Sequence, residues 1–331
     1  MRKKTAAIAF LMSLLPLEQP LLIKTSAAYT TAGDIFLIAE HSKAESAFSL
    51  YKQGNSKLDS GDNNGAISDY TKAIEISPKY SDAYVNRGVA KGNSGDNAGA
   101  ISDYSKAIKI DQSYTLAYVN RGVAKNNIGD HLGAISDYSK AIEIDPKYVS
   151  AYNNRGSIKD EQLQDPYGAI SDYNKAINFN PKYAFAYYNR GIAKNKIGDH
   201  LGAISDYSKA IEIDQNYANA YINRGLIKDE QLQDHYGAIS DYNKAININS
   251  EIALTYYNRG IAKKKIGDHL GAISDYSKAI EIDQNYTNAY INRGLIKDAQ
   301  FGDLEAACSD WLKASNLGDE YSAKRLKEDC Q

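Results

Sequence analysis

Side chains suited to catalysis or metal binding are few and widely spaced in this sequence of 331 residues. Three of the five histidines, His131, His200 and His269, recur at intervals of 69 residues. Equivalent positions in distant copies of a repeated unit do not meet around one metal ion, which needs ligands at about 2 Å. The sequence has no glycine-rich phosphate loop, no Cys-x-x-Cys pair and no Ser/His/Asp grouping. We therefore predict a protein without enzymatic activity, metal site or small-molecule cofactor.

A row of asparagines is the more promising chemical feature. Seven of them recur at intervals of 34 or 35 residues: Asn86, Asn120, Asn154, Asn189, Asn223, Asn258 and Asn292. A primary amide both donates and accepts hydrogen bonds. A regular row of amides can therefore hold the backbone of an extended peptide without reading its side chains. Such a row needs a scaffold that presents equivalent positions at a fixed spacing.

The spacing comes from eight copies of one unit. Aligned on itself, the sequence divides into repeats 1 to 8, namely 47–80, 81–114, 115–148, 149–183, 184–217, 218–252, 253–286 and 287–321. Numbered within a 34-residue copy, position 4 is tyrosine in seven repeats and position 8 is glycine in all eight. An Ala-Ile-Ser-Asp-Tyr segment ending at position 24 recurs in the first seven, and tyrosine usually closes the unit. The high tyrosine content, 27 residues, thus results from repetition of this unit.

Each repeat is predicted to form two helices. In repeat 2, apolar residues recur at three- and four-residue spacing over 84–89 and again over 100–108. Gly95 stands between them as a helix stop and Asp96 as the N-cap of the second helix. Gly99, inside the second helix, is expected to permit close approach of another helix. The chain is therefore predicted to be all-α.

This pattern resembles the tetratricopeptide repeat. Repeat 3 carries the family's motif at Tyr118, Gly122, Ala134, Tyr138, Ala141 and Pro146. Departures from the family are tyrosine for tryptophan at position 4, arginine for leucine at position 7, and glutamine or serine for the position-32 proline in several repeats. The residue pattern of the repeats is similar to that of bacterial, especially cyanobacterial, members of the family. The resemblance covers 47–321 and implies a right-handed superhelical solenoid whose first helices line a concave groove that binds proteins or peptides.

The resemblance places position 6, and hence the seven asparagines, in that groove. It implies a peptide-binding site formed by them together with Tyr188 and Tyr257, which occupy position 5. The alternative is that each asparagine packs neighbouring repeats together. A clamp for C-terminal carboxylates needs lysine at position 5 and asparagine at position 9 of one repeat. No repeat has both, because Asn55 at position 9 of repeat 1 accompanies Tyr51 at position 5.

The charges favour protein partners. Lys and Arg number 39 against 41 Asp and Glu, so the basic excess of a nucleic-acid binder is missing. Repeats of 35 residues also occur in RNA-binding pentatricopeptide arrays, but here the extra residue lies only in the inner turn of alternate repeats. Arginine at position 7 and aspartate at position 23, such as Arg87 and Asp103, would form an ion pair between the two helices. The alternative pairs Asp103 with Lys106 on one helix.

The amino terminus has the three parts of a secretory signal peptide: basic residues 2–4, an apolar run 6–17, and small residues before a cut after Ala28. An uncleaved anchor is the alternative, but twelve residues of helix span only about 18 Å. Loss of 1–28 removes four basic residues and one acidic residue, which leaves a formal charge of −5. We expect export across the inner membrane, to a periplasm, a thylakoid lumen or the medium. Residues 29–46 are predicted to lead into repeat 1, with a helix over 34–46.

The carboxyl end departs from the repeat. Residues 306–314 replace the usual second-helix segment and resemble the ending of Sel1-like bacterial repeats, with 322–331 as a C-terminal cap helix. Cys308 and Cys330 are the two cysteines of the chain. In an exported protein they suggest a disulfide, whose loop of about 20 residues would contribute roughly 3 kcal/mol in the chain-entropy model. The alternative is two buried free thiols.

Together these observations predict a non-enzymatic scaffold that binds a protein or an extended peptide in its concave groove. One alternative is an assembly or stability factor for a membrane complex on the periplasmic or lumenal side. Another is a scaffold that associates with itself through its exposed periodic face. The sequence identifies neither the partner nor the face, concave or convex, that binds it.

Overall fold

A computed structural model describes residues 32–330, which form seventeen α-helices and no strand. The helices are α1 (Ala32–Asp59), α2 (Asn63–Ile76), α3 (Ser81–Asn93), α4 (Asn97–Ile110), α5 (Thr115–Asn127), α6 (His131–Ile144), α7 (Val149–Glu161), α8 (Pro166–Phe179), α9 (Ala184–Lys196), α10 (His200–Ile213), α11 (Ala218–Glu230), α12 (His235–Ile248), α13 (Ala253–Lys265), α14 (His269–Ile282), α15 (Thr287–Phe301), α16 (Leu304–Asn316) and α17 (Glu320–Asp329). The predicted signal peptide, 1–28, lies outside the described residues, so export stays a prediction.

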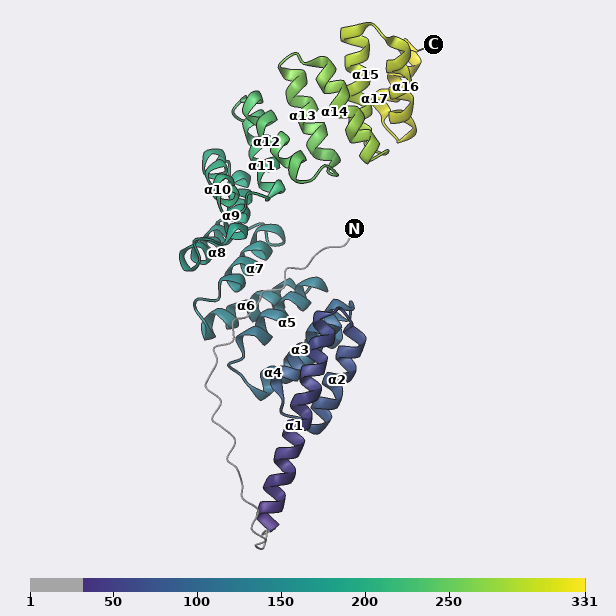
Figure 1. Cartoon of the computed structure of the whole chain (residues 1–331). Coiled ribbons are helices and arrows are strands. Elements are labelled where there is room, and N and C mark those ends of the chain that lie inside the picture. Colours follow the sequence, from purple (N-terminus) through teal and green to yellow (C-terminus); the bar gives the residue numbers. More distant parts are fainter. Residues whose placement is uncertain (1–31, 331) are drawn as a thin grey trace.

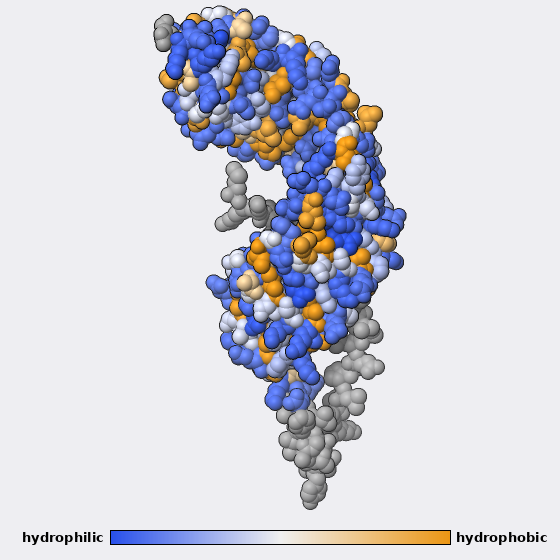
Figure 2. Space-filling model, turned by 180° about the vertical axis from the view of Figure 1, so that it is seen from behind, coloured by the Kyte–Doolittle hydropathy of each residue, from blue (hydrophilic) through white to orange (hydrophobic). Residues whose placement is uncertain are grey.

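The helices pair and stack into a curved array. Each odd-numbered helix from α1 to α15 packs against the even-numbered helix that follows it, and each pair packs against the next (Figure 1). The first helices of neighbouring repeats also contact one another directly, α1 with α3, α3 with α5, α7 with α9 and α11 with α13. Seen from behind, the molecule is an arc hollowed along one side (Figure 2). The predicted all-α superhelical solenoid is confirmed.

A glycine and an aromatic ring join the two helices of each repeat. In repeat 3 the ring of Tyr138, at position 24, lies against Gly122, at position 8, and a Cβ there would be 2.7 Å from the ring. Real Cβ atoms do not approach so closely, so the position needs glycine. Tyr138 is 2% exposed. In repeat 8 Trp311 takes the place of the tyrosine and lies against Gly294 in the same way.

The glycine inside the second helix has a role in capping that we did not predict. The N–H of Gly99 donates to Oδ1 of the N-cap Asp96 at 2.8 Å. A Cβ on Gly99 would collide with that same carboxylate. Gly99 therefore makes room for the capping aspartate, and close helix approach at this position stays a prediction.

An ion-pair frame ties each repeat to the one before it. Arg121 on α5 donates from Nε and Nη2 to both oxygens of Asp137 on α6, at 2.9 and 2.7 Å. Lys125 reaches the same carboxylate at 2.9 Å, and Nη1 of Arg121 donates to Ser105 of repeat 2 at 3.0 Å. Because Asp137 is only 3% exposed, the pair is shielded from water. The predicted pairing between the two helices is confirmed.

The same arginine–aspartate pair recurs in repeats 2 to 8, as Arg87–Asp103, Arg121–Asp137, Arg155–Asp172, Arg190–Asp206, Arg224–Asp241, Arg259–Asp275 and Arg293–Asp310. Repeat 1 lacks the arginine and pairs Lys57 with Asp69 at 2.6 Å instead.

The two ends of the array are extended differently. At the amino end, one continuous helix of 28 residues, α1, covers both the predicted lead-in helix and the first helix of repeat 1. At the carboxyl end, α17 packs against α16, and Arg325 of α17 pairs with Asp298 at 2.7 Å and lies over the Trp311 ring. A disulfide joins Cys308 to Cys330, with their Cα atoms 5.8 Å apart. No helix within residues 32–330 is long and apolar enough to cross a membrane.

Candidate peptide-binding groove

The face of the first helices that is predicted to bind peptides contains two hollows in repeats 2 to 4. Hollow A lies between α3 and α5, has a volume of about 560 Å³ and has α4 as its floor. Its lining residues are Val89, Gly92, Asn93, Asn97, Ala100, Tyr104, Asn120, Val123, Ala124 and Asn127. Apolar side chains and amides alternate in this lining. It can therefore bury an aliphatic side chain and hydrogen-bond a peptide backbone at the same time.

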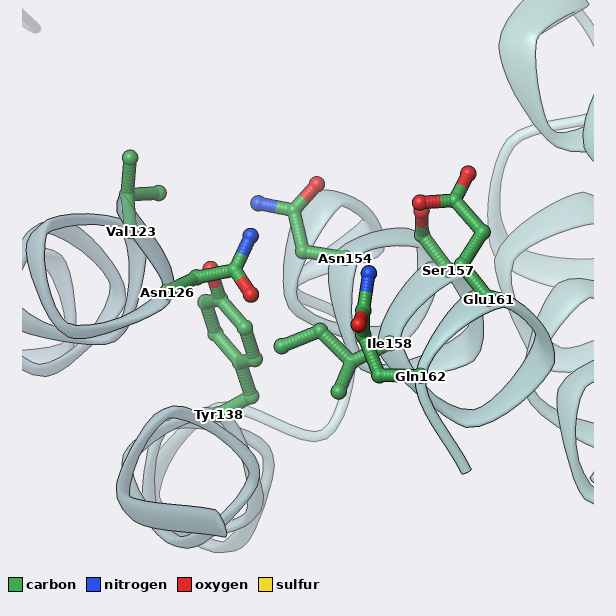
Figure 3. Close-up of a pocket in the computed structure, with 8 residues that line it drawn as sticks. All are labelled: Val123, Asn126, Tyr138, Asn154, Ser157, Ile158, Glu161 and Gln162. Carbon is green, nitrogen blue, oxygen red and sulfur yellow. The ribbon is translucent and has the colours of Figure 1, made fainter. Parts of the chain in front are cut away.

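Hollow B lies between α5 and α7 and is smaller, about 180 Å³. Its lining residues are Val123, Asn126, Tyr138, Ser157, Asn154, Ile158, Glu161 and Gln162. Figure 3 shows Val123 and Asn126 on one helix, Asn154 across from them on the next, and the Tyr138 ring below. Val123 borders both hollows and is 39% exposed. The two hollows therefore form one continuous groove over α3, α5 and α7.

The seven predicted asparagines do not all face this groove with free amides. Four of them donate their Nδ2 to the preceding repeat: Asn86 to Tyr51 and Asn55 (3.0 and 2.9 Å), Asn189 to Asn153 (3.1 Å), Asn223 to Tyr188 (3.2 Å) and Asn292 to Tyr257 (3.0 Å). Asn258 is 8% exposed. Asn120 and Asn154 are the members of the row that line the hollows. The alternative role, packing neighbouring repeats together, thus describes most of the row.

Tyr188 and Tyr257 are likewise engaged within the array. Each hydroxyl accepts a hydrogen bond from the asparagine of the next repeat, and each ring lies close to two other tyrosines. The ring of Tyr188, for example, has its centroid 4.8 Å from that of Tyr217. Burial raises the pKa of both hydroxyls. At their own junctions, these tyrosines therefore fill the space that is equivalent to the one left open in hollows A and B.

The residue at position 5 distinguishes the junctions that a tyrosine closes from the two that contain a hollow. At the junctions that follow repeats 1, 5 and 7 it is a tyrosine, and the following asparagine closes onto it. At the junctions that follow repeats 2 and 3 it is Val85 or Val119, which are too short to reach the amide. Asn120 and Asn154 are consequently left beside a hollow.

Sequence reasoning missed a set of exposed apolar residues at position 2 of the first helix. Position 2 lies one turn before positions 5 and 6, so the three share a helix face. The odd-numbered repeats carry a large apolar residue there: Phe48, Leu116, Phe185 and Leu254, between 37% and 55% exposed. The signal was present in the sequence as an alternation of apolar and polar residues at position 2. Leu116 stands on α5, the helix between the two hollows, although it lines neither of them.

The floor of the groove is uncharged. Burial raises the pKa of Tyr104 and of Tyr138, and the neighbouring Asn154 amide partly offsets the rise at Tyr138. Both hydroxyls are therefore neutral donors at neutral pH. Glu161 at the rim is exposed. This environment suits an apolar, uncharged segment better than a strongly charged one.

The histidines do not converge. His131 and His200 each place Nδ1 2.8 Å from an asparagine of their own repeat, Asn126 and Asn195. His235 pairs with Asp229 at 2.6 Å. Within residues 32–330 no group of three or more His, Cys, Asp or Glu side chains is placed to hold a metal ion.

Family models match most of the repeats. Models described as tetratricopeptide repeats match 81–114, 149–183, 184–217, 218–252 and 253–286, and one described as TPR repeat matches 54–95 and 127–159. These matches cover well over half of the chain. The fold and groove define an α-solenoid of helix pairs, and the chain belongs to the tetratricopeptide repeat family.

Two solved structures with TM-scores above 0.5 share the fold, and MamA is a further match in sequence. A tetratricopeptide repeat protein from Parabacteroides merdae is 21% identical, with 76% of this chain and 99% of that chain covered and a TM-score of 0.54. The C-terminal part of a TPR repeat-containing protein from Cytophaga hutchinsonii is 17% identical, with 73% and 98% covered and a TM-score of 0.58. MamA is 28% identical, with 50% and 96% covered and a TM-score of 0.46. A search of curated proteins found no match.

Proposed function

We propose that this chain is a non-enzymatic interaction scaffold that binds an extended, partly apolar segment of a partner protein in the groove over α3, α5 and α7. Membership of the tetratricopeptide repeat family supports a protein or peptide partner. The position of Asn120 and Asn154 beside hollows A and B carries the proposal. Of the seven asparagines, these two have amides next to space that a ligand can fill.

The groove matches a peptide in its chemistry. Each amide can donate to one backbone carbonyl and accept from one backbone N–H. Val123 lines both hollows and offers apolar surface to a side chain of the peptide, and Leu116 is exposed on the same helix. A bound segment of this kind is recognised by its extended backbone and by one or two apolar anchors. Such a site admits several related sequences and does not require a terminal carboxylate.

Peptides selected from a random 12-residue library on the immobilised protein would test the proposal. We expect the Asn120→Ala/Asn154→Ala variant to bind the selected peptides about tenfold more weakly or worse, because each lost hydrogen bond contributes about 1 kcal/mol. Fluorescence anisotropy with labelled peptides measures the change. The matched control is Asn223→Ala/Asn292→Ala, which removes asparagines already bonded to Tyr188 and Tyr257.

The control should keep its peptide affinity and lose thermal stability. Equal affinity of both double variants for every selected peptide would contradict the groove site. Loss of affinity in the control alone would move the site to the junctions that follow repeats 5 and 7.

A further inference from the structure

A row of exposed apolar side chains follows the edge of the array formed by the inner turns. It occupies the second residue of α6, α8, α10, α12 and α14, helices that succeed one another along the arc (Figure 1). The edge row consists of Leu132, Tyr167, Leu201, Tyr236 and Leu270, which are 71, 70, 69, 73 and 68% exposed. Neither the core nor the groove accounts for them, because none belongs to a core cluster or lines hollow A or B.

Helix formation does not require these residues either. The N-caps are the preceding aspartates, and the third residue of each helix is the glycine whose N–H they bind. Between cap and glycine the second residue points outward, and repeats 1 and 2 carry Asn64 and Ala98 there. Repeats 3 to 7 instead carry a large apolar side chain at each step. Regular exposure of large apolar side chains marks an interaction surface.

The order of residues along the edge row indicates what covers it. Leucine and tyrosine alternate, so the row reads the same in both directions from Leu201. In a two-fold antiparallel contact residue i meets residue j while j meets i, and in this row each such pair would consist of two side chains of the same kind. With Leu201 on the axis, Leu132 faces Leu270 and Tyr167 faces Tyr236 of a second copy. We propose that the edge row is the interface of an antiparallel homodimer with its axis at Leu201.

The size of the surface fits a stable interface. Side chains of this size and exposure bring on the order of 650 Å² of accessible surface per copy. Stable interfaces bury roughly 800 Å² per partner. Ile128, Leu163 and Leu232 of the inner turns, 56, 46 and 45% exposed, flank the row and supply the remainder.

The charged groups near the row are mostly engaged within each copy. Lys196 and Lys265 pair with the buried Asp160 and Asp229, each at 2.8 Å. The capping aspartates accept hydrogen bonds from helix N–H groups, as Asp199 does from Gly202 at 2.9 Å. They remain exposed and negatively charged, and the positive end of the helix dipole reduces their repulsion across the interface.

Sedimentation equilibrium of the full chain tests the proposal. We expect a monomer–dimer equilibrium in which Leu201→Lys raises the dimer Kd at least about tenfold, because the new charge would meet its own copy on the axis. Leu201→Glu should do the same, and an equimolar mixture of the two variants should regain the dimer. Leu312→Lys is the matched control, because Leu312 is 50% exposed on α16 outside the edge row. Circular dichroism checks that each variant keeps its helical content.

The antiparallel register has its own test. Leu132→Lys/Leu270→Glu places opposite charges across the interface and should retain the dimer, whereas Leu132→Lys/Leu270→Lys should lose it. A monomeric wild type up to the highest soluble concentration, or equal Kd values for these two double variants, would overturn the proposal. If the wild type were monomeric and floated with lipid vesicles, and Leu201→Lys abolished this flotation, the row would be assigned to a lipid surface instead. Peptide affinity in the groove should not change in these edge variants, so the two proposals fail independently.

Discussion

The junction between repeats 3 and 4 and the junction between repeats 5 and 6 occupy equivalent places in the 69-residue period. In both, the arginine–aspartate pair joins the two helices of the earlier repeat, and the next repeat has an asparagine at position 6. Yet the first junction contains hollow B, and the second is closed by a hydrogen bond between Asn223 and Tyr188. The difference lies mainly in one side chain, Val119 in the open junction and Tyr188 in the closed one.

A second substitution acts in the same direction. At position 9 of the following repeat, the open junction has Ser157 and the closed junction has Leu226. Small side chains in both places leave space, and large ones fill it. The comparison indicates that the helix frame is uniform, whereas side-chain size at position 5 and at position 9 of the next repeat differs between the open and the closed junction. A repeat array can therefore hold an open groove in one part and a sealed one in another with almost the same sequence.

The largest predicted effect tests the common frame. Asp137→Ala, in the repeat before the open junction, and Asp206→Ala, in the repeat before the closed junction, should each lower the free energy of unfolding by about 3–5 kcal/mol. In each variant an arginine and a lysine lose their buried carboxylate. Urea unfolding followed by circular dichroism measures both losses. Losses that differed by more than a factor of two would show that the frame is not shared.

A smaller effect is expected when the open junction is closed. Val119→Tyr supplies the missing hydroxyl where Asn154 can donate to it, as Asn223 does to Tyr188. We expect peptide affinity to fall about tenfold, since hollow B is filled and its amide is occupied. The measurement is anisotropy with the library-selected peptides. Ile222→Val, a change of one methylene group in repeat 6, is the control and should leave affinity unaltered. Undiminished affinity of Val119→Tyr would break the link between position 5 and binding.

The smallest effect concerns the closed junctions themselves. Tyr188→Phe and Tyr257→Phe remove only the hydroxyl that accepts from Asn223 or Asn292. Each should cost about 1 kcal/mol of unfolding free energy. Tyr321→Phe, at a residue 47% exposed on α17, should cost nothing measurable. If all three variants were equally stable by thermal unfolding, the tyrosine–asparagine bonds would not contribute to closure.

Much of the fold could be predicted because the relevant signals are local. Helix pairs follow from three- and four-residue apolar spacing, and their ends from Gly95 and Asp96. Position 8 glycine and position 24 tyrosine were visible as a repeated pair, although their contact was not. The capping role of Gly99 was not predicted, because it depends on the hydrogen bond from its N–H to Asp96.

The candidate site was predicted less well. All seven asparagines are followed by Arg-Gly, and this shared pattern gave no ground for separating Asn120 and Asn154 from the others. Their separation depends on whether a residue 35 positions earlier, in another repeat, is long enough to accept a hydrogen bond. The apolar residues at position 2, such as Phe185, were overlooked because they alternate with polar residues from repeat to repeat.

The sequence by itself determined the helix pairs, the period of the array and the residues of the ion-pair frame, because these depend on spacing within one repeat. Only the tertiary structure decided which amides line open space, which are bonded across a junction, and that the edge row stays exposed. Those properties depend on side-chain length across an interface between repeats. The physical reason is that a hydrogen bond or a hollow between two repeats is set by distances that neither repeat encodes alone.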